Sequence, residues 1–231
     1  MEDDFKNIVS TDWLAQHLDA PDIRIIDSSW YFPQEKRNAE QEFLECHIPG
    51  ASFFDIDKIK DNDSDLPHML PPSAMFNSTV RKLGIGDGHK VVIYDGLGMR
   101  SAARLWWMFK VFGYSDVVVL DGGFPKWVKE NRSTTADLTE KEIRHLTIYE
   151  DKSIVADRDD VLRATKLNHC SIIDARSEER FMGTAPEPRS GLRSGSIENS
   201  INVPYETLLN EDFTFKSKRE IIDIFSKKGI A

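Results

Sequence analysis

The chain has 231 residues, which suits one large domain or two domains of medium size. Hydrophobic residues make up 40% of it and include 13 Phe and 5 Trp, so the chain can bury a core and lacks the composition of a disordered protein. The formal net charge of −9 argues against non-specific binding to nucleic acid or to an anionic membrane surface.

The first predicted elements are a short helix and a strand. Ser10 and Thr11 are candidates for the N-cap of a helix that carries Leu14 on its apolar face. A short apolar strand follows at 23–26 and ends at Asp27. An aspartate at the end of a buried strand is a polar group placed at the edge of a sheet.

The same alternation continues through the first 120 residues. We predict a second strand at 90–94, a loop at 95–100 and a helix at 101–112 that is stopped by Gly113. A third apolar strand follows at 117–120. Continuous apolar strands that alternate with helices predict an α/β fold, in which a parallel sheet is covered by helices on both faces.

The chain then changes character. Residues 132–152 are polar and show no sheet pattern, so we interpret them as a linker. The linker would join a first domain, residues 1–131, to a second domain at 153–231. The second domain opens with a predicted helix near Val161 and an apolar strand at 170–173.

The second domain repeats the first in order. Three segments recur at offsets between 145 and 149 residues, namely 25–27 at 172–174, 47–51 at 196–200 and 81–85 at 226–230. Three weak matches in one order at nearly one offset predict an internal repeat. By this offset, the counterpart of the loop that begins at Asp95 follows Ala231, so we expect the second domain in this chain to stop before its own loop.

That loop is where we expect the chemistry. Ligands of open parallel sheets sit beyond the carboxyl ends of the strands, and a loop entering a helix presents backbone N–H groups and a positive dipole there. A cysteine held in such a loop would be kept as a thiolate. The first domain has Asp95 at this place, which is not a sulfur nucleophile, so we expect its loop to be non-catalytic.

On its longest motifs the chain resembles the tandem-domain rhodanese family, and within it the mercaptopyruvate sulfurtransferases. The motifs are residues 27–31, 47–57, 68–71, 106–109, 120–123 and 180–189. The resemblance implies two tandem rhodanese-like domains, of which the second is incomplete here. It also implies an enzyme that takes sulfane sulfur from 3-mercaptopyruvate on a cysteine, as a persulfide, and passes it to a thiol or other acceptor such as thioredoxin or cyanide. That cysteine would follow Ala231.

Four positions match functional residues of the family. Arg180 and Arg189 match the arginines that bind the carboxylate and keto oxygen of the donor, which suits guanidinium chemistry. Asp57 and His68 match first-domain residues proposed to handle protons or polarise the active-site network. Thiosulfate-preferring relatives tend to lack an arginine at the place of Arg189, so mercaptopyruvate is favoured. No Cys/His spacing suggests a metal, and no cofactor is implied.

Several other interpretations stay open. The donor could be thiosulfate, or the chain could be a non-catalytic module that binds an anion through Arg180 and Arg189. A separate chain could carry the segment that the repeat predicts after Ala231. A cysteine-based phosphatase would need a longer loop with Cys and Arg, which this sequence lacks. Asp57 could instead cap a helix, and His68 could simply pack between domains.

The two cysteines bear on the compartment. Two cysteines in 231 residues make no disulfide framework, which favours a reducing, cytoplasmic setting. The start of the chain has no secretory pattern, and no apolar run has the length of a membrane span. We predict that Cys170 is a buried structural thiol, because it lies in the apolar strand predicted at 170–173. Cys46 precedes His47, but adjacent residues rarely form a catalytic dyad.

Overall fold

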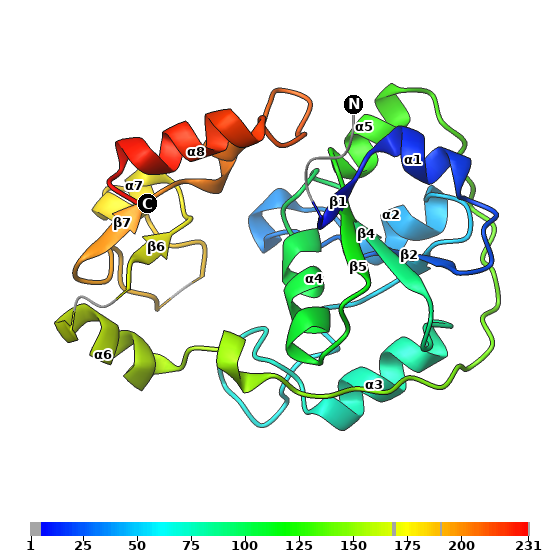
Figure 1. Ribbon diagram of the computed structural model, residues 1–231, viewed down its shortest axis with the longest axis horizontal. Coiled ribbons are helices and arrows are strands. Elements are labelled where there is room, and N and C mark those ends of the chain that lie inside the picture. The colour runs from blue at the N-terminus through cyan, green and yellow to red at the C-terminus, as the bar shows by residue number, and fades with distance from the viewer. Residues whose placement is uncertain (1–5, 168–169, 190, 231) are drawn as a thin grey trace. The chain divides into compact units, whose positions relative to one another are not determined.

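The computed structural model describes residues 6–167, 170–189 and 191–230, and the chain divides into two units (Figure 1). The first unit ends at Lys152 and also takes in Asp212–Thr214. The second unit consists of Ser153–Glu211 and Phe215–Ala231.

A five-stranded sheet organises the first unit. Its strands are β1 (Ile8–Val9), β2 (Ile23–Asp27), β3 (Ser52–Phe53), β4 (Lys90–Tyr94) and β5 (Val117–Leu120), in the spatial order β1-β5-β4-β2-β3. Every pair of neighbours is parallel, which confirms the predicted parallel sheet. The two edge strands have two residues each and were not predicted from the sequence.

Helices cover both faces of this sheet (Figure 1). They are α1 (Thr11–Gln16), α2 (Ala39–Glu45), α3 (Ser73–Lys82), α4 (Ala102–Val111) and α5 (Gly123–Lys129), with a 3-10 turn at Pro33–Glu35. Leu14, Phe43 and Trp127 pack from α1, α2 and α5 onto one set of strand side chains. Phe76 of α3 and Phe109 of α4, with ring centroids 5.1 Å apart, belong to the layer on the other face, because strand side chains alternate between faces.

Two local signals of the sequence are confirmed in the first unit. The Ser10 side chain accepts a hydrogen bond from Trp13 N at 3.1 Å and so caps α1. Gly113 has a φ of 79°, a left-handed conformation that ends the chain segment of α4 without the strain a side chain would add.

The predicted linker packs along the first unit. Apart from an isolated bridge at Thr135 and the start of a 3-10 turn at Lys152–Ile154, residues 132–152 contain no helix or strand. Thr135 exchanges two backbone hydrogen bonds with His47, both 2.9 Å long. Lys141 Nζ donates to the carbonyl of Gly50 at 2.9 Å. The segment is therefore anchored to the first unit, and it does not behave as a free tether.

The second unit contains a shorter set of the same element types. It comprises α6 (Arg158–Leu167), β6 (Ile172–Asp174), α7 (Glu178–Met182), β7 (Ser200–Asn202), a 3-10 turn at Tyr205–Leu208 and α8 (Lys218–Lys227). The strands β6 and β7 form a parallel pair. The predicted strand at 170–173 starts two residues later than expected, at Ile172.

Parts of the two units have matching geometry. Asp27, the last residue of β2, pairs with Phe53 of β3, and Asp174, the last residue of β6, pairs with Asn202 of β7. The bounds of α3 and α8 lie 145 residues apart at both ends. Each helix is followed, two residues later, by a glycine in the left-handed conformation, with φ values of 78° and 74°.

Candidate active site

The first residue of the loop after β4, Asp95, accepts backbone hydrogen bonds from the loop and from the start of α4. Asp95 is buried, and its Oδ1 accepts from Leu97 N at 2.9 Å. Its Oδ2 accepts from Arg100 N at 2.7 Å and from Ala102 N at 2.8 Å. Three backbone N–H groups of this loop and of the start of α4, which are of the kind that holds anions at a helix N-terminus, therefore already bind a carboxylate of the chain.

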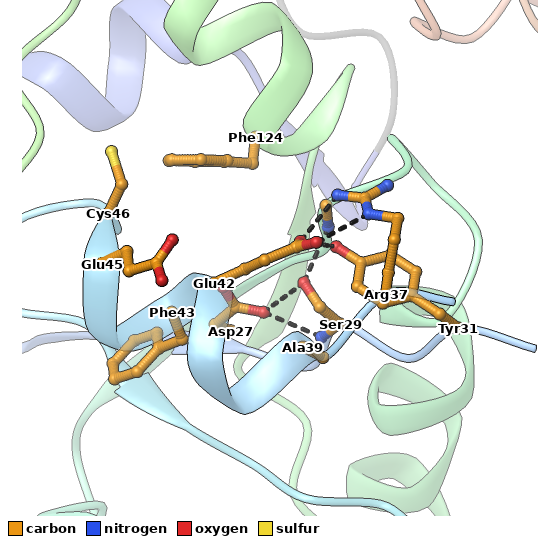
Figure 2. Close-up of a pocket in the computed structure, with 11 residues that line it drawn as sticks. Asp27, Ser29, Tyr31, Arg37, Ala39, Glu42, Phe43, Glu45, Cys46 and Phe124 are labelled. Atoms are coloured by element: carbon orange, nitrogen blue, oxygen red, sulfur yellow. Dashed lines mark hydrogen bonds and ion pairs between the residues drawn. The ribbon is translucent and has the colours of Figure 1, made fainter. Parts of the chain in front are cut away.

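A cavity of about 220 Å³ lies beside this loop, at the carboxyl ends of β2 and β4 (Figure 2). It is lined by Asp27, Ser29, Tyr31, Arg37, Ala39, Glu42, Phe43, Glu45, Cys46, Gly96 and Phe124. The sequence analysis did not identify this cavity. The one signal that pointed to it was the aspartate that ends the first long apolar strand.

Asp27 is the most buried acid of the cavity, with 5% of its surface exposed. Its Oδ1 accepts from Ser29 N at 2.8 Å and from Ser29 Oγ at 2.5 Å. Burial raises the pKa of Asp27 to about 6, because the charged form loses its hydration, and nearby Asp95 adds to the shift. The hydrogen bonds from Ser29 oppose the rise in pKa without cancelling it.

A second group of the cavity is an ion pair between Glu42 of α2 and Arg37, which precedes that helix. Arg37 Nε donates to Glu42 Oε1 at 2.8 Å, and Arg37 Nη2 donates to Glu42 Oε2 at 2.7 Å, so the pair is bidentate. The Tyr31 hydroxyl donates to Glu42 Oε2 at 2.7 Å. These bonds lower the pKa of Glu42, mainly through the Arg37 hydrogen bond, while burial raises the pKa of Tyr31 well above its ordinary value.

Asp57 and His68 are in direct contact, although eleven residues separate them. His68 Nε2 lies 2.6 Å from Asp57 Oδ1, and the side chains are 16% and 61% exposed respectively. Asp57 lies in a turn and caps no helix, so the capping interpretation is wrong. An imidazole whose nitrogen meets a carboxylate can exchange a proton with a bound molecule while the carboxylate fixes its tautomer.

Two further side chains hold this pair, and the sequence analysis did not find them. Trp30 Nε1 donates to Asp57 Oδ2 at 3.0 Å, and its ring meets the His68 ring edge-on with centroids 4.9 Å apart. Arg104 of α4 donates from Nη2 to the His68 carbonyl at 2.5 Å. That bond supports His68 in a left-handed conformation, with a φ of 57°, which a histidine seldom adopts.

Arg180 lies on α7 in the second unit and pairs with a buried carboxylate. Its Nη2 donates to Glu187 Oε2 at 2.5 Å and its Nε at 3.2 Å. The Glu187 side chain is only 4% exposed, whereas that of Arg180 is 26% exposed. Arg180 lowers the pKa of Glu187, so the carboxylate stays charged and fixes one edge of the guanidinium.

Arg176 completes this network. It donates to both oxygens of Asp174, with Nη2 at 2.5 Å from Oδ2, and from Nη1 to Glu187 Oε1 at 2.8 Å. The hydrogen bonds from Arg176 lower the pKa of Asp174. The buried Glu187 is thus shared by two arginines. The orientation of Arg180 therefore depends on Glu187, and through it on Arg176 and Asp174.

Arg189 follows Glu187 by two residues and lies half-buried in a bend. The four residues proposed from the sequence therefore fall into two groups, Asp57 with His68 in the first unit and Arg180 with Arg189 in the second. Within the first group the side chains touch. Within the second group the two arginines flank one buried acid along the chain.

Both cysteines have exposed thiols and neither forms a disulfide. The prediction that Cys170 is buried is wrong, because Cys170 lies in a bend ahead of β6 and not inside the strand. Cys46 follows α2 and lines the cavity of the first unit.

The described part of the chain offers neither a metal site nor a membrane span. Among residues 6–167, 170–189 and 191–230, no three His, Cys, Asp or Glu side chains are grouped so that they could hold a metal ion. Over the same residues, every helix is too short or too polar to cross a bilayer.

Comparison with known proteins gives concordant results. The family model of the rhodanese-like domain matches residues 10–130. The 3-mercaptopyruvate sulfurtransferase of Rattus norvegicus is 38% identical over 98% of this chain and 78% of its own length. The thiosulfate sulfurtransferase of the same species is 40% identical over the same shares of both chains.

Solved structures agree with the sequence relatives. The crystal structure of SseA from Escherichia coli, described as a 3-mercaptopyruvate sulfotransferase with the rhodanese fold, superposes with a TM-score of 0.88 at 37% identity. The superposition covers 97% of this chain and 84% of that one. The α/β architecture predicted from the sequence is thus the rhodanese fold.

Proposed function

The chain belongs to the rhodanese-like family of sulfurtransferases, which are enzymes, and from that membership we propose that it moves the sulfur atom of 3-mercaptopyruvate, as the sulfane sulfur of a cysteine persulfide, to a thiol or other acceptor. In the proposed reaction a cysteine thiolate attacks the donor sulfur, the carbon–sulfur bond breaks and pyruvate leaves as its enolate, which takes up a proton. The cysteine persulfide then passes its outer sulfur to an acceptor such as thioredoxin or cyanide.

The observation that carries this proposal is the arrangement of Arg180. One edge of its guanidinium is held by Glu187, a nearly buried carboxylate, and the side chain is 26% exposed. A guanidinium that is both fixed and accessible suits bidentate binding of a donor carboxylate. We propose that Arg189 adds a second cation for the same donor, at its keto oxygen.

We propose that Asp57 and His68 handle protons in this reaction. Their 2.6 Å contact gives the imidazole a defined tautomer, and the partial exposure of both groups leaves them accessible to a substrate. In one step of the reaction, such a pair would donate the proton that converts the enolate into pyruvate.

We also propose that the second unit begins a second rhodanese-like domain, within domain limits of 1–131, 132–152 and 153–231. Support comes from the matched pairing of β2 with β3 and β6 with β7, and from the 145-residue offset of α3 and α8. By this offset the counterpart of Asp95 would be residue 240, and the persulfide-bearing cysteine would lie in that loop. The reducing setting that two free thiols favour is consistent with a cytoplasmic enzyme.

The experiment has two parts. First, the intact mass of the natural protein is measured, and we expect it to exceed that of residues 1–231 by roughly fifty residues, the length that the repeat implies. Second, sulfur release is assayed with 3-mercaptopyruvate and with thiosulfate. Faster turnover of 3-mercaptopyruvate supports the proposal, and a preference for thiosulfate makes the protein a thiosulfate sulfurtransferase. A mass that stops at Ala231 without activity on either donor would leave a non-catalytic anion-binding module.

A further inference from the structure

The cavity of the first unit occupies the place where ligands bind in open α/β sheets. After β2 the next strand, β3, is added on one side of the sheet, whereas after β4 the next strand, β5, is added on the other side. The parallel neighbours β2 and β4 therefore flank a topological switch point. Crevices at such switch points, beyond the carboxyl ends of the strands, are the usual ligand sites. Asp27 at the end of β2 and Gly96 just after β4 both line the cavity.

Sites at this position of a sheet often bind anions, but the lining of this cavity does not suit an anion. The carboxylate of Asp95 accepts from the amides of Leu97, Arg100 and Ala102. The amide of Gly96, which lines the cavity, donates to Ser29 Oγ at 2.8 Å. The one guanidinium in the lining, Arg37, is committed to Glu42 by two hydrogen bonds. No lining group is therefore left with a positive charge to offer.

The remaining charges of the lining are negative. Once Arg37 and Glu42 are counted as a neutral pair, the carboxylates of Asp27 and Glu45 remain. Asp27 is 5% exposed and belongs to the inner wall, while Glu45 is on the exposed side of α2. A cation entering the cavity would meet one carboxylate inside and one at the rim.

An aromatic wall completes the site. Figure 2 shows the ring of Phe124 on one side of the cavity and the side chains of Glu42 and Glu45 on the other. The face of an aromatic ring attracts a cation and also packs against its alkyl part. Three grouped carboxylates or imidazoles that could hold a metal are absent from the described residues, so the combination favours an organic cation over a metal ion.

We propose that this cavity binds a small organic ammonium ion, with its N–H groups directed to Asp27 and Glu45 and its alkyl part against Phe124. The volume of about 220 Å³ lies below the usual range for drug-sized ligands, so the ligand is small. This site is separate from the residues of the proposed sulfur transfer, and it stands whether or not that transfer is confirmed.

The test uses the two exposed thiols as reporters. Cys46 lines the cavity and Cys170 does not, so alkylation of both by N-ethylmaleimide can be followed by mass spectrometry in one sample. The probes are propylammonium chloride, neutral propionamide and sodium propionate at equal ionic strength. We expect propylammonium alone to slow the labelling of Cys46 saturably, to leave Cys170 unchanged and to shift the amide resonance of Gly96.

A charge-removing variant and a matched control make the test specific. Glu45→Gln should raise the half-saturating propylammonium concentration about tenfold, the loss expected for one charge-assisted contact. Glu40→Gln is the matched control. Glu40 lies on the same helix, but its carboxylate pairs with Lys58 outside the cavity, so this change should leave binding unchanged. Equal effects of the three probes, absence of both Cys46 protection and a Gly96 shift, or unchanged binding in Glu45→Gln would each overturn the proposal.

Discussion

His68 Nε2 lies 2.6 Å from Asp57 Oδ1, and this contact joins two segments of the first unit that no regular element connects. If the pair handles protons in sulfur transfer, Asp57→Asn should lower kcat by about a hundredfold, the lower end of the range for general acid–base groups. The side chain of Asp57 is 61% exposed, so the variant should fold normally. The pH profile of kcat in the full-length protein should change shape.

The control for this prediction is Asp65→Asn. Asp65 is exposed and lies in the same stretch of chain as His68. It should leave kcat and its pH profile unaltered. An Asp57→Asn enzyme with the wild-type profile would show that the contact is structural only.

Removal of the guanidinium of Arg180 should act on donor binding. Arg180→Ala is expected to lower kcat/KM for 3-mercaptopyruvate by about 10- to 150-fold, the value of one hydrogen bond to a charged group, mostly through KM. Arg180→Lys should recover only part of this loss, since an ammonium cannot form the bidentate contact. Arg193→Ala, an exposed arginine of the same unit, is the matched control. Equal losses in Arg193→Ala would argue for a general charge effect.

The buried Asp27 should make stability depend on pH. Its carboxyl titrates near 3.8 in the unfolded chain and near 6 in the folded one, so the folded state prefers the protonated form. Stability is therefore lost as pH rises between these values, and above pH 6 the full cost, on the order of 3 kcal/mol, is present. Asp27→Asn keeps an acceptor for Ser29 and removes the charge.

Urea unfolding at pH 5 and pH 8 measures this effect. The stability of Asp27→Asn relative to the wild type should increase by about 1 kcal/mol from pH 5 to pH 8. At pH 5 the wild type bears only part of the cost of ionising Asp27, whereas at pH 8 it bears the full cost. Asp137→Asn, at an exposed position, should show no such change. A constant difference between wild type and Asp27→Asn would mean that the folded pKa is not raised.

The sequence predicted the parts of the fold that depend on long apolar runs. The strands at 23–27, 90–94 and 117–120 are rich in Val, Ile and Leu, and the predicted bounds agree with the observed ones to within one residue. The strands β1 and β3 have two residues each, too few for a periodic pattern, and exist because Ile8 pairs with Val119 and Phe53 with Asp27. Such pairing is a property of the folded sheet.

The site was predicted less completely, for a similar reason. The family motifs identified Asp57 and Arg180 but gave no sign of what orients them. Trp30 reaches Asp57 across 27 residues, and the role of Glu187 depends on its burial between two arginines. Residue type gives the chemistry of a side chain, whereas burial and orientation arise only when distant segments pack.

The packing of α5 against the loop after β4 gives a final prediction. Gly123 has a φ of 57°, and a Cβ added there would lie 2.8 Å from both the carbonyl oxygen of Asp95 and the Cα of Gly98. Gly123→Ala should therefore lower the free energy of unfolding in two ways. The left-handed backbone costs about 1–2 kcal/mol, and the added Cβ clashes with backbone atoms that have little room to move. Gly88→Ala isolates the first cost, because Gly88 has a φ of 85° and nothing within 4 Å of its added Cβ.

Thermal unfolding separates the two costs. Gly88→Ala should lower Tm by a few degrees, at roughly 2–4 °C per kcal/mol for a chain of this size, and Gly123→Ala by at least about twice as much. Because Phe124 follows Gly123 and lines the cavity, Gly123→Ala should also weaken the protection of Cys46 by propylammonium, while Gly88→Ala should not. Equal shifts of Tm in the two variants would mean that α5 can move away from the loop at no cost, and that the aromatic wall of the cavity is not fixed by this contact.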